Sequence, residues 1–196
     1  MNIIENLGIS VHKEHMPHLQ AIEQEDYSGV ARKVREFYKA VMRHEPSEEY
    51  MKTGIIGLKE YYAIALLDPL NAHAVSEKID YFWHAHILHA EQYELFCKRV
   101  VGRTMHHIPM DKKNPTELEN VMTLYDYTSE IMRKIFKNVE THNWPLRDTP
   151  EYELVCTHGG DTCGSSESRK GQPYLPGHES ALFPRDPRGE LYAYNN

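Results

Sequence analysis

Residues 76–101 read SEKIDYFWHAHILHAEQYELFCKRVV, and Gly102 follows directly. On an ideal helix, which turns by about 100° per residue, this stretch has an apolar side and a polar side. The apolar side carries Ile79, Phe82, Trp83, His86, Ala90, Tyr93, Cys97 and Val101, and the polar side carries Glu77, Asp80, His84, Glu91 and Lys98. This helical period predicts one amphipathic helix from about Ser76 to Val101, with Gly102 as its C-terminal stop.

The same period continues on both sides of this stretch. Apolar residues recur at three- and four-residue spacing over about 28–44 and again over about 115–139. Pro46-Ser47 and Asp68-Pro69 enclose a further helix over about 48–67. No run alternates between polar and apolar residues as a half-buried strand does. The sequence therefore predicts an all-α fold, a single-domain bundle of about four to five helices.

The composition changes after about Pro145. Residues 157–196 contain six Gly, four Pro and four Ser, with little apolar periodicity. We expect a helical domain over 1–145 that carries the histidines, followed by an irregular Pro/Gly-rich C-terminal extension over 146–196. Short apolar groups such as Leu182-Phe183-Pro184 leave open whether that extension is mobile or docks on the bundle.

Charge and cysteine content narrow the class of protein. The net charge is −7 and the two signs are interspersed, which argues against a nucleic-acid-binding stripe and against an anionic membrane surface. The three cysteines, Cys97, Cys156 and Cys163, do not form a disulfide framework. The N-terminus lacks the pattern of a signal peptide, and no apolar run is long enough to span a membrane. We therefore expect a cytoplasmic protein whose partner is a small molecule.

Several common catalytic motifs are absent from the sequence. It contains no Gly-x-Gly-x-x-Gly or Walker loop, no His-Glu-x-x-His and no Gly-x-Ser-x-Gly. Hydride transfer, phosphoryl transfer and serine hydrolysis are accordingly disfavoured.

Histidines are the most informative side chains for function. The carboxylate of Asp80 and five imidazoles fall within 28 residues; the imidazoles are those of His84, His86, His89, His106 and His107. Neutral imidazole and carboxylate are the ligands that first-row metals prefer in helical bundles. Asp80 and His84 are i and i+4 on the polar side, whereas His86 and His89 are i and i+3 towards the apolar side. The turn at Gly102 can bring His106 and His107 back towards either of these two pairs.

His84 and His86 are about 200° apart on a regular helix, so their spacing alone does not make a shared chelate. Structural alternatives also remain open. A lone histidine on an apolar face is commonly a hydrogen-bonded core residue, and a surface Asp80–His84 pair is commonly a weak contact. A second run, His12, His15 and His18, could supply a distant ligand or form an exposed charged segment.

The pattern Asp80-x-x-Trp83-His84-x-His86-x-Leu88, continued by Tyr93, Cys97, Gly102-Arg103 and His106-His107, resembles the signature of the glycine-rich domain-containing protein-like family. The resemblance covers about 30 residues densely. It implies a mostly helical fold and a metal site at Asp80, His84, His86, His106 and His107, but no established activity. His89 departs from the family pattern, where aspartate is usual in bacterial members. Either the helix is distorted near Ala85, or only one of the two histidines ligates and the other orients a neighbour.

Our first hypothesis is a small non-haem iron-dependent oxidoreductase or oxygenase, with manganese, copper or zinc as alternative metals. Tyr93 would line the substrate pocket with Trp83 and Tyr81, and Arg103 would anchor a substrate carboxylate. The alternatives are a non-catalytic interaction module with a structural His/Trp core and a metal storage or delivery protein. Burial discriminates between them: metal ligands converge on one point, whereas structural histidines each have a separate hydrogen-bond partner.

Overall fold

The computed structural model describes residues 2–69, 71–108, 114–149 and 164–165. These residues form α1 (Ile3–Asn6), a 3₁₀ helix η1 (Lys13–His15), α2 (Met16–Gln24), α3 (Ser28–Met42), α4 (Glu48–Leu67), α5 (Glu77–Ile87), α6 (Ala90–Val101), β1 (His107–Ile108), α7 (Pro115–Ile135) and β2 (Gly164–Ser165). The all-α prediction is confirmed. The described part has more helices than the expected four to five, because short helices precede Ser28 and the helix expected over 76–101 is divided.

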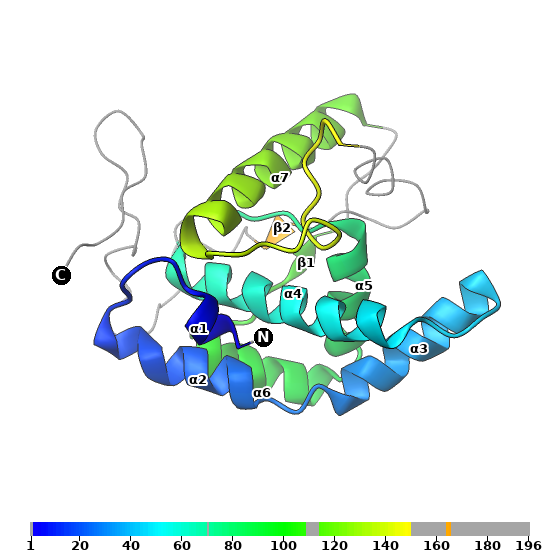
Figure 1. The fold of residues 1–196 in the computed structure, drawn as a ribbon, viewed down its shortest axis with the longest axis horizontal. Coiled ribbons are helices and arrows are strands. Elements are labelled where there is room, and N and C mark those ends of the chain that lie inside the picture. Colours follow the sequence, from blue (N-terminus) through cyan, green and yellow to red (C-terminus); the bar gives the residue numbers. More distant parts are fainter. Residues whose placement is uncertain (1, 70, 109–113, 150–163, 166–196) are drawn as a thin grey trace.

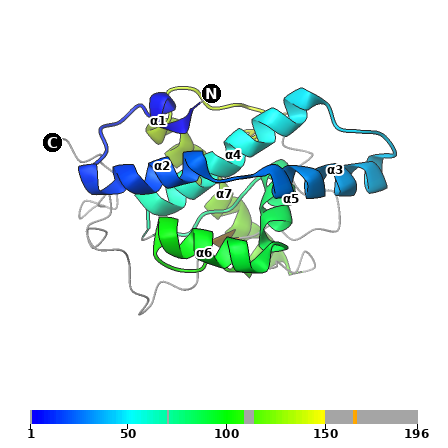
Figure 2. The same ribbon diagram turned by 90° about the horizontal axis from the view of Figure 1, so that it is seen from below.

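Helix α4 is the centre of the bundle. It contacts α1, α2, α5, α6 and α7, and every residue from Glu60 to Leu67 is buried. Figure 1 shows α4 crossing the middle of the molecule, with α7 on one side and α2 and α6 on the other. The view in Figure 2 shows α2 and α3 following one another in a row across the molecule. A helix segment that is buried on all sides, as this second half of α4 is, is stable only when other elements surround it.

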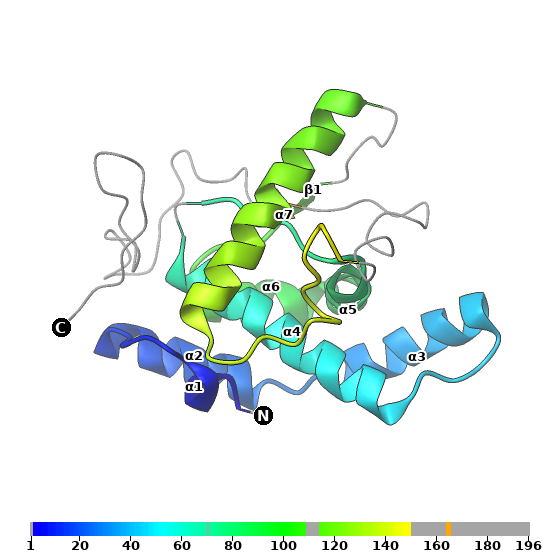
Figure 3. The ribbon, with the colours of Figure 1, turned by 45° about the horizontal axis from the view of Figure 1, so that its top comes forward.

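Helix α7 packs on the bundle mainly through its C-terminal half, where Tyr125, Thr128, Ile131, Met132 and Ile135 are buried. Its N-terminal half stands clear of α4 in Figure 3. The helix begins after Asn114, whose side chain accepts a hydrogen bond from the Thr116 N–H at 3.1 Å. It ends at Ile135, four residues before the expected Val139, because Phe136 is extended and forms a β-bridge with Leu7.

Two glycines of α4 allow α5 to approach it closely. A Cβ atom at Gly54 would lie 2.1 Å from Cζ of Phe82, and one at Gly57 would lie 2.4 Å from Cδ1 of Ile79. Only hydrogen fits at these two positions. Ile79 and Phe82 lie on the apolar side of α5, and polar residues occupy the other side of the same turns. Their contact with α4 therefore fixes the direction in which the polar face of α5 points.

The expected continuous helix over 76–101 is wrong at one point. Helix α5 ends at Ile87, and His89 (φ −92°, ψ 58°) precedes the first residue of α6. A straight helix of that length would extend roughly 37 Å and could not pack both halves on α4. Nδ1 of His89 lies 2.9 Å from the carbonyl oxygen of Ala85 and binds the backbone at the break. Periodicity did not reveal this turn because the apolar stripe continues in phase through it.

None of the helices in the described ranges is long and apolar enough to cross a membrane. The predicted C-terminal extension, 146–196, lies outside the described residues apart from 146–149 and β2. Strand β2 pairs with β1 in an antiparallel register, with His107 opposite Ser165.

Candidate metal centre

A cluster at the surface of α5 brings together the side chains of Asp80, His84 and His107. Each offers one ligand atom, and these atoms all lie within 4.8 Å of one another; among the described residues this is the one group of three or more potential ligands with such spacing. Asp80 is buried, while His84 and His107 are half-buried. The centre therefore has one carboxylate at its base and two imidazoles that reach towards solvent.

Two elements bring the three residues together. Asp80 and His84 lie on adjacent turns of α5, as the i, i+4 spacing predicted. Helix α6 then ends at Gly102, whose φ of 77° reverses the chain, and β1 returns to α5 with His107. The His107 ring packs against Trp83 with 5.3 Å between ring centroids and against His84 with 4.1 Å.

The contacts around Asp80 are those of a charged cluster. Its Oδ1 lies 3.2 Å from Nδ1 of His84 and 3.6 Å from Nε2 of His107. Burial alone would raise the pKa of the Asp80 carboxyl, but hydrogen bonds and positive charge from the two histidines outweigh it and hold that pKa below its usual value. The carboxyl is consequently ionised at neutral pH, which is the state that binds a cation.

The His84 ring also contacts the main chain. Its Nδ1 lies 2.9 Å from the carbonyl oxygen of Asp80. A proton on Nδ1 at this position leaves the lone pair on Nε2, which is the usual arrangement of a metal-binding histidine.

His86 lies elsewhere, in the core. Its Nδ1 is 2.8 Å from the hydroxyl oxygen of Tyr62, the rings of Tyr27 and Tyr93 meet it edge-on, and the tilted ring of Phe96 lies beside it. Burial lowers the pKa of His86 to about 4, with a smaller contribution from the charge of His89. A regular helix through Ala85 thus separates His84 from His86, and the structure does not bring His86 to the cluster.

The other predicted ligands are also outside the group of three. His89 contacts the backbone at the α5–α6 turn, and His106 is exposed. In the N-terminal run, the His12 side chain accepts a hydrogen bond from the Glu14 N–H at the start of η1, and His15 is buried with a pKa lowered to about 4, mainly by burial.

Tyr93 and Arg103, the predicted catalytic residues, are buried. The Tyr93 hydroxyl donates to the carbonyl oxygen of Met105 at 2.6 Å and accepts the indole N–H of Trp83 at 2.9 Å. Arg103 is 5% exposed. Neither side chain faces the pocket described next. Cys97 is buried beside Tyr93, and burial raises the pKa of its thiol to about 11, as expected for a core thiol.

A pocket of about 630 Å³ opens between α3, α4, the first turns of α5 and the segment 140–145. Of the three aromatic residues predicted to line a substrate pocket, Tyr81 does so. The other lining residues, among them Tyr38, Tyr50 and Lys78, were not predicted from the sequence. The apolar stripe of α3 could have revealed them, because it continues to Val41, which is 60% exposed. Apolar side chains without a neighbouring element often border a binding pocket.

Fold and site together define an all-α protein with one carboxylate and two histidines clustered on its surface. The chain belongs to the UCP032817-like family, whose family model matches residues 28–130, slightly more than half of the sequence. No curated protein and no solved structure shows a significant match.

This match corrects the resemblance to the glycine-rich domain-containing protein-like family, which was wrong. The spacing of Trp83, Tyr93 and Cys97 that supported the resemblance reflects their packing, since all three are buried on the core side of α5 and α6. Such spacing arises in helical proteins of different families because the helical period dictates it.

Proposed function

We propose that this protein binds one first-row metal ion through Asp80, His84 and His107. The observation that carries the proposal is the convergence of the three side chains within 4.8 Å from two separate elements. Neighbouring ligand atoms around an ion with bonds of about 2.1 Å lie roughly 3.0–3.4 Å apart. Oδ1 of Asp80 lies 3.6 Å from Nε2 of His107, so the side chains would have to move closer together around an ion. Small movements of the half-buried imidazoles would complete the coordination.

Two buried histidines outside the cluster support this assignment by contrast. His86 contacts the Tyr62 hydroxyl, and His73 pairs with Asp68 through Nε2 and Oδ2 at 3.3 Å. Each of these has its own partner, as structural histidines do. Asp80, His84 and His107 instead share one point.

Two histidines and one carboxylate, without a thiolate, form the ligand set of non-haem iron enzymes that keep open coordination positions. We therefore propose iron first, with manganese, copper and zinc as alternatives, and a small oxygen-using oxidoreductase that acts on a small molecule. Bound iron would supply the redox chemistry. Asp80 would contribute the negative charge, and the two imidazoles would leave the solvent side open.

The proposal is tested by elemental mass spectrometry on untagged protein purified without oxygen after growth with iron, manganese, copper or zinc. We expect about one ion per chain in the wild type, and almost none in His84→Ala or His107→Ala, because two remaining ligands hold a first-row ion weakly. His106→Ala is the matched control: it removes an exposed imidazole next in sequence to His107, and it should keep the metal.

His86→Ala adds a second control. It should lower the melting temperature, because it leaves a cavity and the Tyr62 hydroxyl without its partner, yet the folded fraction should retain the ion. A wild-type protein that is folded and free of all four metals would refute the proposal. The Asp80 cluster would then be a hydrogen-bonded structural element of a non-catalytic interaction module.

A further inference from the structure

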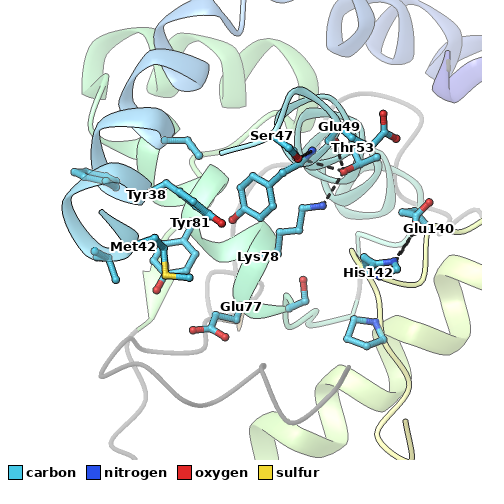
Figure 4. Close-up of a pocket in the computed structure, with 16 residues that line it drawn as sticks. Tyr38, Met42, Ser47, Glu49, Thr53, Glu77, Lys78, Tyr81, Glu140 and His142 are labelled. Carbon is cyan, nitrogen blue, oxygen red and sulfur yellow. Dashed lines mark hydrogen bonds and ion pairs between the residues drawn. The ribbon is translucent and has the colours of Figure 1, made fainter. Parts of the chain in front are cut away.

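The pocket between α3, α4 and α5 has the size and lining of a small-molecule site. Its volume of about 630 Å³ lies within the usual range for ligand pockets. One wall is apolar and aromatic, and it comprises Val34, Phe37, Tyr38, Val41, Met42 and Tyr50. Figure 4 shows Tyr38, Tyr81 and Met42 on one side of the pocket and the Glu140–His142 pair on the other, with Lys78 between them.

Lys78 is the cation of this pocket. Its Nζ donates to the Thr53 hydroxyl at 2.7 Å and lies 4.8 Å from the centroid of the Tyr50 ring. The side chain is half-buried, and no carboxylate among the described residues lies within ion-pair distance of its ammonium group. Glu140 and Glu49 attract this ammonium group from a longer distance. A half-buried ammonium group gains further free energy when an anion binds it directly.

The acidic residues of the lining are arranged differently. Glu140 is paired with His142, with 3.1 Å between Oε1 and Nδ1. Glu49 is exposed at the start of α4, near the N-terminal end where the helix dipole favours a carboxylate. Glu77 occupies the first turn of α5, where the helix dipole also favours a carboxylate. Each therefore has a favourable setting of its own, and none of the three forms a direct ion pair with Lys78, although Glu140 and Glu49 attract it from a longer distance.

We propose that this pocket binds a small carboxylic acid with an aromatic body, whose carboxylate pairs with Lys78 and whose ring packs among Tyr38, Tyr50 and Tyr81. The proposal does not depend on a metal ion at Asp80. It replaces Arg103 as the predicted carboxylate anchor, because Arg103 is buried away from the pocket.

The test compares three probes of nearly equal shape: 3-phenylpropionate, 3-phenylpropionamide and 3-phenylpropylamine. Their affinities are measured by isothermal titration calorimetry on the full chain after metal removal with a chelator, and again after reloading with iron. We expect the carboxylate to bind at least tenfold more tightly than the amide in both preparations, since a charge-assisted hydrogen bond contributes about 1.5–3 kcal/mol. Binding that appears with iron alone would place the carboxylate at the metal and overturn the pocket assignment.

Lys78→Met keeps the aliphatic stem and removes the charge, and it should abolish the preference for the carboxylate over the amide. Lys52→Met is the control, because Lys52 is exposed on α4 and does not line the pocket.

Should Lys78→Met fail to fold, Val41→Glu and Val41→Gln test the same point at an exposed residue of the lining. The Glu variant should weaken carboxylate binding relative to the Gln variant. Tighter binding of the amine than of the carboxylate would overturn the proposal in favour of the acidic residues. Absence of binding by all three probes would also overturn it and would indicate that a protein segment fills the pocket.

Discussion

Glu60 lies in the middle of α4 with its side chain fully buried. The indole N–H of Trp144 donates to its Oε2 at 3.0 Å. The pKa of Glu60 is raised to about 7: burial raises it, the Trp144 hydrogen bond opposes the shift, and repulsion from Glu140 adds a smaller increase. A carboxyl group with a pKa this far above its usual value makes the folded state sensitive to pH.

The sign of the effect follows from proton binding. Between about pH 4.5 and pH 7 the unfolded chain loses the Glu60 proton while the folded chain keeps it, so the free energy of unfolding falls as pH rises through this window. At about 1.4 kcal/mol per pKa unit, the fall attributable to Glu60 is about 3 kcal/mol. His15 and His86, whose pKa values are lowered to about 4, act in the opposite direction, since protonation of the unfolded chain reduces stability below about pH 6.5.

Glu60→Gln isolates the contribution of Glu60. Urea unfolding at pH 5 and pH 7.5 should show that the variant gains more stability, or loses less, than the wild type on going to the higher pH. The contribution of the histidines is the same in both proteins, whereas glutamine accepts the Trp144 hydrogen bond and does not ionise. Glu119→Gln, at an exposed position of α7, should leave the pH dependence unchanged. An identical pH dependence in Glu60→Gln and wild type would show that Glu60 does not titrate in this window.

At the scale of elements, the distance between α4 and α5 depends on Gly54. Alanine normally stabilises a helix interior relative to glycine by about 1 kcal/mol. Here its methyl group would overlap the Phe82 ring, which is fully buried and cannot move aside without disturbing the core. Steric overlap thus lowers the stability of the alanine variant, whereas the higher helix propensity of alanine raises it.

We expect Gly54→Ala to destabilise the protein by a net 1–3 kcal/mol, roughly the cost of overpacking a core. The control is Gly29→Ala in α3, where the new methyl group would meet the half-buried His89 ring at 2.9 Å, a side chain that can shift towards solvent. Thermal unfolding followed by circular dichroism should therefore give a lower melting temperature for Gly54→Ala than for Gly29→Ala. The reverse order would mean that α5 moves freely away from α4.

At the scale of the whole molecule, Asn6 connects two segments that lie about 130 residues apart in the sequence. Its Nδ2 donates to the carbonyl oxygen of Asn138 at 2.8 Å, and its Oδ1 accepts the Asn138 N–H at 3.1 Å. The backbone adds two bonds beside it, from Gly8 to Ile135 at 2.7 Å and from Lys137 to Asn6 at 2.8 Å. One buried amide therefore joins the N-terminal segment to the end of α7.

Asn6→Ala should lower the free energy of unfolding by about 2 kcal/mol, because it leaves two backbone groups of Asn138 without their partner. Asn138→Ala is the matched control: it changes the same residue type and removes only the longer contact from its Nδ2 to Oδ1 of Asn6, at 3.4 Å, but keeps the N–H and carbonyl that bind Asn6. Denaturant unfolding of both variants measures the difference. Equal stabilities would show that solvent replaces the Asn6 contacts at no cost.

The local parts of this structure were predictable from the sequence. The bounds of α4, Glu48–Leu67, and the stop at Gly102 agree with the prediction, because capping residues, proline and glycine act on their immediate neighbours. The pair Asp80–His84 was also visible, since residues four apart lie on one face of a helix. The break at His89 was not, because it arises from the packing of α5 and α6 on the same partner helix.

The sequence by itself determined the helical class, the central helices and the supply of potential ligands. Only the tertiary structure decided which histidines meet. It placed His107 beside Asp80 and His84, left His106 exposed and enclosed His86 among aromatic rings. The physical reason is that ligand convergence depends on where β1 returns to α5, and that position is fixed by contacts between distant segments, including the approach of α5 to Gly54 and Gly57.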